Sequence, residues 1–396
     1  MLETGGWGGI AHYAWNLCQA IAKEGADVVL LTNTRYELAS LSSTFRVEPF
    51  FDGGVGYLRT ASAFLRRLRA LAPDVVHVQS LISTRFDALL WPWVRRRTPL
   101  VITAHNVRTH EREPWLHWTL WRCLRSADAV IVHTEESAQV VAARLGPGAR
   151  IRLIRQGDYA FFAGDGVADR QQARRLLDLP GHAKILLAFG AIRPYKGILE
   201  LIAALPRIRA RHPDAFLVIA GPLLVGREET YRRAIKGTGI ETAVAFRPQY
   251  VPHERVAAYF IAADVAVYNY HDVTDSGSLR IACSLGTPVV ATAVGGFREF
   301  LTDGVTGRLV PPEAPELLVE AISDVLADPA AAAKMADAAR ELAASAWPWA
   351  DSARATCDLY RELLGAGPRR ADRAASSKDP SVGSRRPDES GKSHGN

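Results

Sequence analysis

The chain has 396 residues, and 48% of them are hydrophobic, which is enough apolar material for two ordinary α/β domains. Lysine and arginine outnumber aspartate and glutamate by 48 to 42, but residues 366–396 hold seven basic and four acidic residues and so supply three of the six excess charges. The rest of the chain is only mildly basic. This balance argues against a dedicated nucleic-acid binder, which would cluster its charge more strongly.

The cysteine content and the hydropathy pattern indicate in which cellular compartment the chain is found. The four cysteines lie far apart and show neither a zinc spacing nor a small disulfide framework. No run of about 18 apolar residues occurs, and the first residues lack the basic-then-apolar pattern of a signal peptide. We therefore expect a cytoplasmic chain, which at most attaches to the inner face of a membrane.

Short hydrophobic runs alternate with amphipathic stretches along the chain, which is typical of parallel sheets joined by helices. The first set of expected strands covers residues 28–31, 75–78, 100–103, 129–132 and 151–154. The second set covers residues 185–189, 216–220, 244–246, 265–268 and 288–292. Because these runs are continuously apolar, helices are expected on both faces of each sheet. The sequence predicts an α/β fold with two doubly wound, Rossmann-like domains.

The polar, turn-rich stretch 158–183 separates the two sets and is expected to connect the domains. The predicted parts are a first domain over residues 1–158, a second domain over 159–346, a closing helix over 347–364 and a disordered tail over 365–396. The tail is rich in Arg, Ser, Pro, Gly and Asp and cannot bury a core.

The start of the first domain departs from the usual pattern. A doubly wound domain normally opens with a central strand that leads into a glycine loop, but here the glycines begin at Gly5. We expect Met1, Leu2 and Glu3 to be the end of that strand, with the rest of it upstream.

Three segments follow predicted strands or open predicted helices and so are candidates for phosphate binding. The first is the glycine loop from Gly5 to Gly9, which runs into an amphipathic helix whose free amides, unobstructed by side chains, can approach a phosphate. A tight turn without a ligand explains the same glycines and stays open as an alternative.

The second segment holds Arg193 and Lys196, which lie three residues apart between an expected strand and helix. At that end of an open α/β sheet both cations can meet a diphosphate, although solvated surface charges are the alternative interpretation. The third segment carries Ser276 and Gly277 at the start of another helix, where free N–H groups can hold a phosphate or Ser276 simply caps the helix. A further loop, from Gly295 to Glu299, points toward the same sheet edge.

Together these motifs resemble family 4 of the retaining glycosyltransferases, which have the GT-B fold. The resemblance covers about residues 5–364 and rests on Gly-Gly-Ile-Ala-His-Tyr, Thr-Ala-His-Asn-Val, Ile-Arg-Pro-Tyr-Lys-Gly, Asp-Ser-Gly-Ser-Leu and Gly-Thr-Pro-Val-Val-Ala-Thr-Ala-Val-Gly-Gly-Phe-Arg-Glu. It implies two Rossmann-like domains facing a cleft, a last helix that crosses back to the first domain, and sugar transfer from a nucleoside diphosphate without a required metal.

The resemblance also implies roles for individual residues. Arg193 and Lys196 would hold the diphosphate and stabilise the charge on the leaving group, and His105 would lie beside the donor sugar, unless it caps a buried strand end. Further donor-binding residues implied in this way are Gly8, Gly9, Phe246, Tyr250, Val251, Asp275, Ser276, Gly277, Ser278 and Leu279. No general base is nominated, because in a retaining, front-face mechanism the leaving phosphate receives the acceptor's proton.

The sequence departs from the family pattern at the residues that bind the ribose of the donor and in the loop that follows the first strand of the second domain. Many members carry glutamates at the positions that match Thr274 and Ala282, where the second usually holds the ribose, and an arginine at the position of Ala191. Glu299 is the remaining candidate for the ribose.

The first domain is expected to bind a saccharide or lipid-linked acceptor. Its stretches 64–69, 91–97 and 115–125 interleave aromatic or aliphatic residues with arginines, as suits a membrane interface. A helix whose apolar face meets the core and whose arginines meet water explains 115–125 equally well. Two other functions stay open at this point: a sugar-nucleotide epimerase or hydrolase of the same architecture, and a non-catalytic sugar-nucleotide-binding protein.

Overall fold

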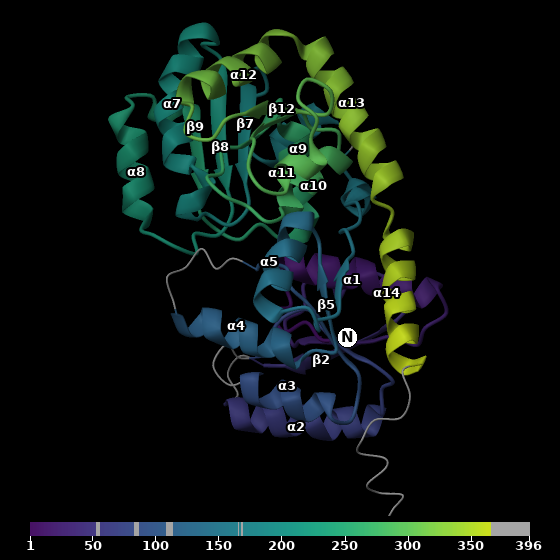
Figure 1. Ribbon diagram of the computed structural model, residues 1–396. Helices are drawn as coiled ribbons and strands as arrows, with labels where there is room; N and C mark the ends of the chain where they lie inside the picture. The colour runs from purple at the N-terminus through teal and green to yellow at the C-terminus, as the bar shows by residue number, and fades with distance from the viewer. Residues whose placement is uncertain (53–55, 83–86, 108–113, 165, 168, 366–396) are drawn as a thin grey trace, which may run out of the picture.

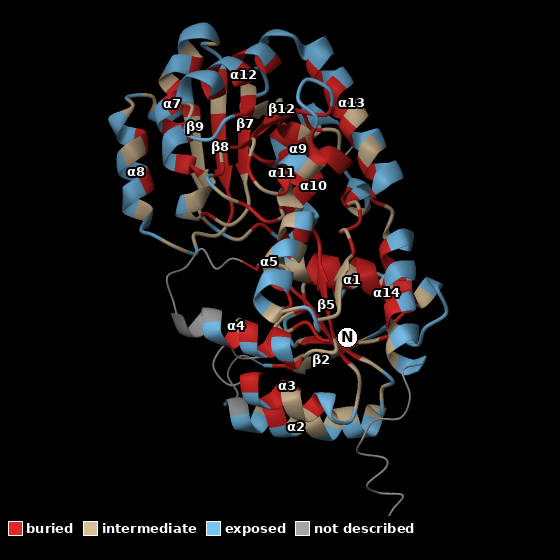
Figure 2. Cartoon of the chain, in the orientation of Figure 1, coloured by how far each residue is buried: buried red, intermediate tan, exposed pale blue. Residues whose placement is uncertain are grey.

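A computed structural model of the chain describes residues 1–52, 56–82, 87–107, 114–164, 166–167 and 169–365. The first domain contains a two-stranded and a four-stranded group of parallel strands, and the second domain contains a six-stranded parallel sheet. Helices cover the strands of both domains, and the domains are stacked one above the other (Figure 1). Most strands are buried, β2 (Arg46–Phe51), β6 (Ile151–Leu153) and β9 (Val244–Arg247) are only partly so, and the helices expose their outer faces (Figure 2). The expected disorder of the C-terminal tail concerns residues that lie outside the described ones, apart from Gly365.

The first domain contains six named strands and five α-helices within the described residues. The strands are β1 (Val29–Asn33), β2 (Arg46–Phe51), β3 (Val76–Val78), β4 (Leu100–Thr103), β5 (Ala129–Val132) and β6 (Ile151–Leu153). The helices are α1 (Gly8–Lys23), α2 (Tyr57–Leu71), α3 (Asp87–Arg95), α4 (Pro114–Ser126) and α5 (Glu135–Leu145). β1 pairs with β2, and β3 to β6 pair in sequence order. Leu2 joins the two groups through parallel bridges to Leu31 and Val78.

The second domain follows a short 3-10 helix, Ala160–Gly164, and its sheet has the order β12-β11-β10-β7-β8-β9. The strands are β7 (Lys184–Phe189), β8 (Ala215–Ala220), β9 (Val244–Arg247), β10 (Val265–Tyr268), β11 (Val289–Thr292) and β12 (Arg308–Val310). The helices are α6 (Arg170–Leu176), α7 (Ile198–Arg211), α8 (Glu228–Gly237), α9 (His253–Ala262), α10 (Gly277–Ser284), α11 (Phe297–Phe300), α12 (Pro315–Ala327) and α13 (Pro329–Ala346). All neighbouring strands are parallel. This architecture confirms the predicted fold class.

The last helix, α14 (Trp349–Gly365), crosses from the second domain to the first and runs beside α1 (Figure 1). Its buried residues Ala353 and Cys357 pack in one apolar cluster with Leu17 and Ile21 of α1. The Trp349 indole donates to the backbone oxygen of Asp158 at 2.6 Å, which fixes the crossing point. The predicted closing helix is therefore present, and it ties the two domains together.

Two strands were not predicted. β2 lies at the edge of its sheet, where it has Pro49 in its middle and only one fully buried residue, Phe51. β12 has only three residues and also lies at an edge. Neither produces the continuous apolar run that marks a central strand. All four cysteines are buried with free thiols, and among the described helices none has the length and apolarity needed to cross a bilayer.

Candidate active site at the facing sheet edges

The two cationic and amide-rich loops of the second domain flank the point where the strand order reverses. From β7 the chain proceeds to β8 and β9 on one side and then returns to β10, β11 and β12 on the other. The loop with Arg193 and Lys196 follows β7, and the loop with Ser276 to Ser278 follows its neighbour β10. Open α/β sheets bind their ligands at this switch point, outside the carboxyl ends of the strands.

Hydrogen bonds hold these two loops together. The His271 amide donates to the Tyr195 carbonyl at 2.7 Å, and the side-chain amide of Asn269 donates to the Gly197 carbonyl at 3.2 Å. Gly197 has a φ of 61°, and a Cβ there would lie 2.0 Å from the Asn269 carbonyl oxygen. Only glycine fits this position, so the sequence Lys196-Gly197 is what lets the first loop approach the second.

Lys196 lies in the crevice between the loops. A Cβ built on Gly190 would be 3.1 Å from its Nζ and 3.9 Å from the Cβ of Ser278. The Nζ also lies 5.1 Å from the ring centroid of Tyr270. Burial, reinforced by the positive charge of Arg193, lowers the pKa of Lys196 to about 7. Two neighbouring cations that are partly desolvated favour an anion between them, and a diphosphate is such an anion.

The N-terminus of α10 supplies the other half of this crevice. Ser276 is the N-cap, and its hydroxyl oxygen accepts the Leu279 amide at 3.3 Å. The hydroxyl of Ser278 donates to the Phe189 carbonyl at 3.3 Å, which brings the helix start against the end of β7. The alternative interpretation of Ser276 as a helix cap is therefore correct for its hydroxyl. As at any helix N-terminus, the first turn also has amides that no carbonyl of the same helix can accept.

Three predicted donor-binding side chains occupy other positions. Leu279 and Val251 are buried in the core of the second domain, so their side chains do not line the crevice. Asp275 pairs with Arg280, with 3.3 Å between Oδ1 and Nε, and both side chains are almost fully buried. The Oδ1 atom of Asp275 is thus engaged within the protein, where it holds the loop in place, and its contact with the donor stays a prediction.

Further contacts fix the Arg280 side chain of this ion pair. Its guanidinium lies 4.1 Å from the ring centroid of Phe300 and donates a 3.0 Å hydrogen bond to the Gln156 carbonyl. Gln156 lies between β6 and the 3-10 helix Ala160–Gly164, just before the predicted connection of the domains. The pair thus links the loop after β10 to the segment just before the interdomain connection.

The glycine loop of the first domain already holds an anionic group. The Gly8 amide donates to Oε1 of Glu37 at 2.6 Å, and His12 pairs with the same oxygen at 3.0 Å. Burial opposes the ionisation of Glu37, but the hydrogen bonds from His12, Tyr250 and Gly8 outweigh it and lower the pKa of this carboxyl. A Cβ added to Gly8 or Gly9 would meet nothing within 4 Å, so open space lies above the loop.

Tyr250 connects this loop to the second domain. Its hydroxyl donates to Glu37 and lies 3.2 Å from the Gly8 amide, while its ring contacts the Trp7 ring edge-on at 4.9 Å between centroids. Phe246 lies at the end of β9, where it stacks on Tyr231 at 5.8 Å. The structure therefore places Tyr250 at the meeting point of the two domains and Phe246 at the far edge of the second sheet.

His105 follows β4 at the facing edge of the first sheet. Its Nε2 lies 3.0 Å from the Gln79 side-chain oxygen, and its Nδ1 lies 3.2 Å from Nε2 of His133. The ring also meets Tyr13 edge-on at 4.7 Å. Burial lowers the pKa of His105 well below its usual range, so the imidazole is neutral at physiological pH. Both ring nitrogens have protein partners, and His105 is accordingly an oriented ring rather than a mobile proton carrier.

Glu299, the candidate for the ribose, contacts the first domain instead. Its Oε2 accepts the Glu135 amide at 3.3 Å and lies 3.4 Å from Arg155. Glu135 is the first residue of α5, and Arg155 follows β6, so both partners belong to the first domain. Glu299 therefore contributes to domain contact in this arrangement.

The prediction missed Glu37, Gln79 and His133. Gln79 and His133 each come directly after a buried strand, β3 and β5, and a polar residue at the carboxyl end of a parallel strand is a usable signal. Glu37 lies in an irregular segment between β1 and the unpredicted β2, and nothing in its sequence neighbourhood marks it. Its proximity to Gly8 is a product of the tertiary structure.

Comparison with known proteins agrees with this geometry. A family model described as Glycosyltransferase Family 4 matches residues 7–157, and one described as Glycosyl transferases group 1 matches residues 169–342. The chain is 28% identical to a D-inositol 3-phosphate glycosyltransferase of Corynebacterium efficiens over 407 aligned positions, which cover 94% of this chain and 95% of that protein.

A second relative is similar in sequence, and a solved structure is similar in fold. The chain is 33% identical, over 278 residues, to a GDP-mannose-dependent alpha-(1-6)-phosphatidylinositol monomannoside mannosyltransferase of Mycolicibacterium smegmatis, covering 66% of this chain and 70% of that protein. The solved structure of Anabaena Alr3699/HepE in complex with UDP-glucose superposes with a TM-score of 0.74 and 20% identity over 92% of this chain and 99% of that one, which shows the fold.

Two Rossmann-like domains whose strand ends face each other, with a helix that returns to the first domain, define the GT-B fold. The chain belongs to family 4 of the glycosyltransferases. Its second domain matches the model described as Glycosyl transferases group 1. It is therefore an enzyme that transfers a glycosyl group.

Proposed function

We propose that the chain transfers a sugar from a nucleoside diphosphate to a saccharide or lipid-linked acceptor, with retention of the anomeric configuration. The observation that carries the proposal is the crevice at the switch point of the second sheet, where Lys196 and the N-terminus of α10 meet at Gly190. A cation with no carboxylate partner in the described part of the chain and a set of helix amides suit a diphosphate.

Each part of the crevice has a role in this proposal. Lys196 and Arg193 bind the diphosphate, and the amides of Gly277 and Ser278 add hydrogen bonds to it. Gly8 and Gly9 close over the phosphates from the first domain, so that Glu37 leaves the Gly8 amide when donor binds. Phe246 and Tyr250 border the nucleobase, and the fixed ring of His105 forms the wall beside the sugar. The proposal needs no metal, because the two cations supply the positive charge.

The bond changes balance without an added reagent. The bond between the sugar anomeric carbon and the phosphate oxygen breaks, and its electron pair stays on that oxygen. The acceptor oxygen forms a bond to the same carbon on the same face, and its proton passes to the departing phosphate. The products are the glycoside and the free nucleoside diphosphate.

The names of the relatives support the substrate classes. One relative is described as GDP-mannose-dependent and acts on a phosphatidylinositol mannoside, and another is described as acting on D-inositol 3-phosphate. We propose a nucleoside-diphosphate hexose as donor and an inositol-bearing or related saccharide as the acceptor class.

The first test is a donor panel. GDP-mannose, UDP-glucose and UDP-N-acetylglucosamine are incubated with the protein, each with and without inositol 3-phosphate or a mannosylated phosphatidylinositol. We expect acceptor-dependent release of the nucleotide from one donor, and NMR of the product should show the anomeric configuration of that donor. Acceptor-independent binding without release from any donor would favour a non-catalytic protein, and an inverted product would reject the retaining mechanism.

The pKa of Lys196 predicts proton uptake on binding of a nucleoside diphosphate. Above pH 7 the free amine is mostly neutral, whereas a bound diphosphate favours its charged form and raises its pKa. At pH 8 binding should take up about one proton, and affinity should weaken as the pH rises above 7. At pH 6 the amine is already charged, so Lys196 should take up almost no proton, and the partly protonated diphosphate should instead release protons on binding. Calorimetry in buffers with different ionisation enthalpies measures this difference, and equal uptake at both values would contradict it.

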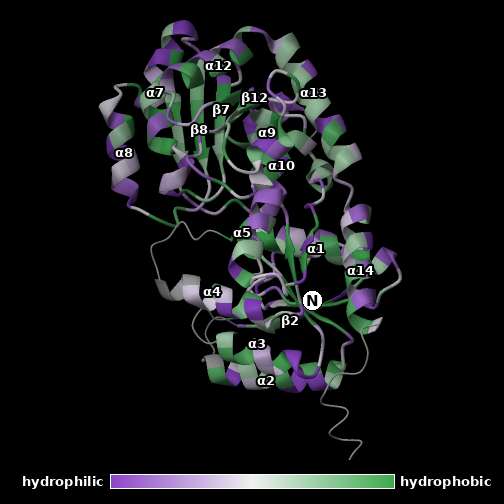
Figure 3. Ribbon diagram, viewed as in Figure 1, coloured by the Kyte–Doolittle hydropathy of each residue, from purple (hydrophilic) through white to green (hydrophobic). Residues whose placement is uncertain are grey.

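A basic and apolar surface on the first domain supports binding to an anionic membrane. Helices α2 and α3 lie at the end farthest from the second domain, and α4 packs against α3 (Figure 1). α2 carries hydrophilic and hydrophobic residues side by side (Figure 3). Leu58, Leu89 and Trp118 are 82%, 75% and 51% exposed. The exposed arginines of the same helices and the turn after α3 are Arg59, Arg66, Arg69, Arg95, Arg96, Arg97, Arg122 and Arg125. The alternative interpretation of α4 holds only in part: Trp121 and Leu124 face the core, but Trp118 does not.

Vesicle flotation tests this surface. We expect the protein to float with anionic phosphatidylglycerol vesicles at low salt and not with neutral vesicles, because each basic residue near the surface contributes about 1 kcal/mol. Leu58→Ser with Leu89→Ser should reduce flotation, whereas Leu317→Ser, an exposed leucine of α12 on the second domain, serves as the control. Equal flotation of both variants would place the membrane contact elsewhere, and no flotation of the unmodified protein would reject it.

A further inference from the structure

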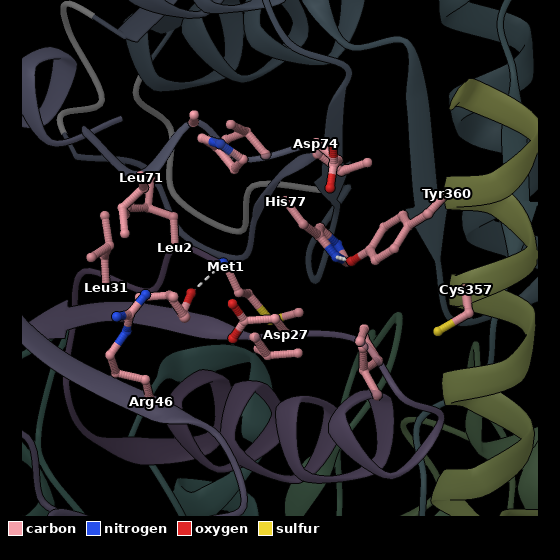
Figure 4. A pocket seen from close by; sticks show the side chains of 18 of the residues that line it. Met1, Leu2, Asp27, Leu31, Arg46, Leu71, Asp74, His77, Cys357 and Tyr360 are labelled. Atoms are coloured by element: carbon pink, nitrogen blue, oxygen red, sulfur yellow. Dashed lines mark hydrogen bonds between the residues drawn. The ribbon is translucent and has the colours of Figure 1, made fainter. Parts of the chain in front are cut away.

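A chain of hydrogen bonds connects the closing helix α14 to His105. The hydroxyl of Tyr360 on α14 lies 2.6 Å from Nδ1 of His77, a buried residue of β3. Both side chains line the pocket drawn in Figure 4, where a dashed line marks this contact. Nε2 of His77 lies 3.1 Å from one end of the Gln79 carboxamide, and the other end lies 3.0 Å from Nε2 of His105. A helix that crosses between the domains is thus joined to a ring at the facing sheet edge.

The chain of hydrogen bonds continues beyond His105 and ends on the backbone. Nδ1 of His105 lies 3.2 Å from Nε2 of His133, whose Nδ1 lies 2.8 Å from the carbonyl oxygen of Ile154. His77, Gln79 and His133 are buried, whereas His105 is half-buried and keeps part of its surface accessible. Of these four residues, His105 is therefore the one that a substrate can touch.

All three imidazoles of this chain are neutral at physiological pH. Burial lowers the pKa of His77 to about 3, and it also lowers the pKa of His105 and that of His133 below the ordinary value. A neutral imidazole has one nitrogen that donates a hydrogen bond and one that accepts. The position of the proton on one ring therefore determines whether the next group must donate or accept.

The carbonyl at the end of the chain determines the direction of these hydrogen bonds. Because the Ile154 carbonyl can only accept, His133 donates from Nδ1 and accepts at Nε2. His105 must then donate from Nδ1 to His133, which leaves Nε2 of His105 as an acceptor. That acceptor requires a donor on Gln79.

A half-turn of the Gln79 carboxamide satisfies every bond in the chain. Its oxygen faces His105 and its nitrogen faces His77, and a half-turn about the last side-chain torsion exchanges the two. The amino group then donates to Nε2 of His105, and the oxygen accepts from Nε2 of His77. The hydroxyl oxygen of Thr103, at 2.7 Å, is a second acceptor for the same proton. With its proton on Nε2, His77 accepts the hydroxyl proton of Tyr360 at Nδ1.

We propose that Tyr360 and His77 are positioning residues for glycosyl transfer. The Tyr360 hydroxyl keeps the proton of His77 on Nε2, and His77 thereby keeps the amino group of Gln79 on His105. The ring of His105 is then held in one plane with its proton on Nδ1. Because Tyr360 belongs to α14, the packing of this helix on the first domain sets the ring. The inference rests on the proposed function only for the place of His105 beside the donor sugar.

NMR of the full chain with ¹⁵N-labelled histidine tests the proton order without any substrate. In the unmodified protein His105 should be protonated on Nδ1 and bare on Nε2. Tyr360→Phe should shift the tautomer ratio of His105 about fivefold toward the Nε2 form, the effect of losing one hydrogen bond. The matched control is Tyr36→Phe, which should leave this ratio unchanged. The Tyr36 hydroxyl is buried in the apolar cluster of α1 and α14 but has no hydrogen-bond partner in the described part of the chain.

Turnover supplies the second readout. Tyr360 has no contact with the donor in the proposed function, so Tyr360→Phe should lower kcat about fivefold while KM for the donor stays within about twofold. Tyr36→Phe should retain both constants. The proposal is overturned by a proton on Nε2 of His105 in the unmodified protein, by equal tautomer ratios in the two variants, or by equal kcat. If the donor panel gives no turnover, that failure concerns the proposed function, whereas the NMR measurement still decides the proton order.

Discussion

Lys196→Ala is expected to lower the turnover number by about 10²- to 10³-fold, which corresponds to about 3–4 kcal/mol of transition-state stabilisation. Lys196 lies beside Gly190, where the β7 and β10 loops meet, and in the proposed reaction the departing phosphate gains its charge there. A steady-state assay of nucleotide release gives the effect, and the loss should appear in both kcat and kcat/KM because the interaction strengthens as the bond breaks.

The matched control is Lys236→Ala, which removes the same charge from an exposed position on α8. It should retain normal turnover and normal stability. Lys196→Ala should also abolish the proton uptake expected at pH 8, and this second readout separates a direct role from a general loss of structure. Turnover within a factor of three of the unmodified enzyme would reject the assignment of Lys196 to the diphosphate.

Asp275→Ala is expected to lower the free energy of unfolding by about 3–5 kcal/mol, because it leaves the charge of Arg280 buried without a partner. The Arg280 side chain has no exposed surface and that of Asp275 has 3%. Urea denaturation followed by fluorescence measures the loss. Reduced activity of this variant at temperatures where it stays folded would reflect displacement of the loop that carries Ser276 to Ser278.

The double replacement Asp275→Leu with Arg280→Met distinguishes an unpaired charge from a lost contact. It should recover most of the stability, since removing both members of a buried pair is often nearly neutral. Glu228→Ala breaks an exposed pair with Arg232 on α8 and should cost under about 1 kcal/mol. A similarly small cost for Asp275→Ala would show that the buried pair does not hold the loop.

The sequence identified the central strands and the loops at their carboxyl ends because both leave strong local patterns. Continuous valine and isoleucine runs marked β4, β5, β8 and β10, and the cations and glycines that follow such runs pointed to Arg193, Lys196 and Ser276. The edge strands β2 and β12 were not predicted, because half-exposed or very short strands lack that pattern.

The local pattern could not assign partners to the polar residues. Asp275 follows a strand in the same way as Ser276, but whether its carboxylate faces a ligand or Arg280 depends on the packing of α10 against Phe300 and Gln156. The same holds for Glu299, whose contacts at α5 arise only when the two domains meet.

The sequence by itself determined two α/β domains, the order of their strands along the chain, and the cationic loop that the second domain presents at its strand ends, because hydrophobic period and glycine placement act over a few residues. The tertiary structure alone decided that Glu37 accepts a hydrogen bond from the Gly8 amide and that Gln79 and His133 hold the ring of His105. Contacts between segments far apart in the chain depend on how the sheets and domains are assembled, and no short stretch of sequence encodes that assembly.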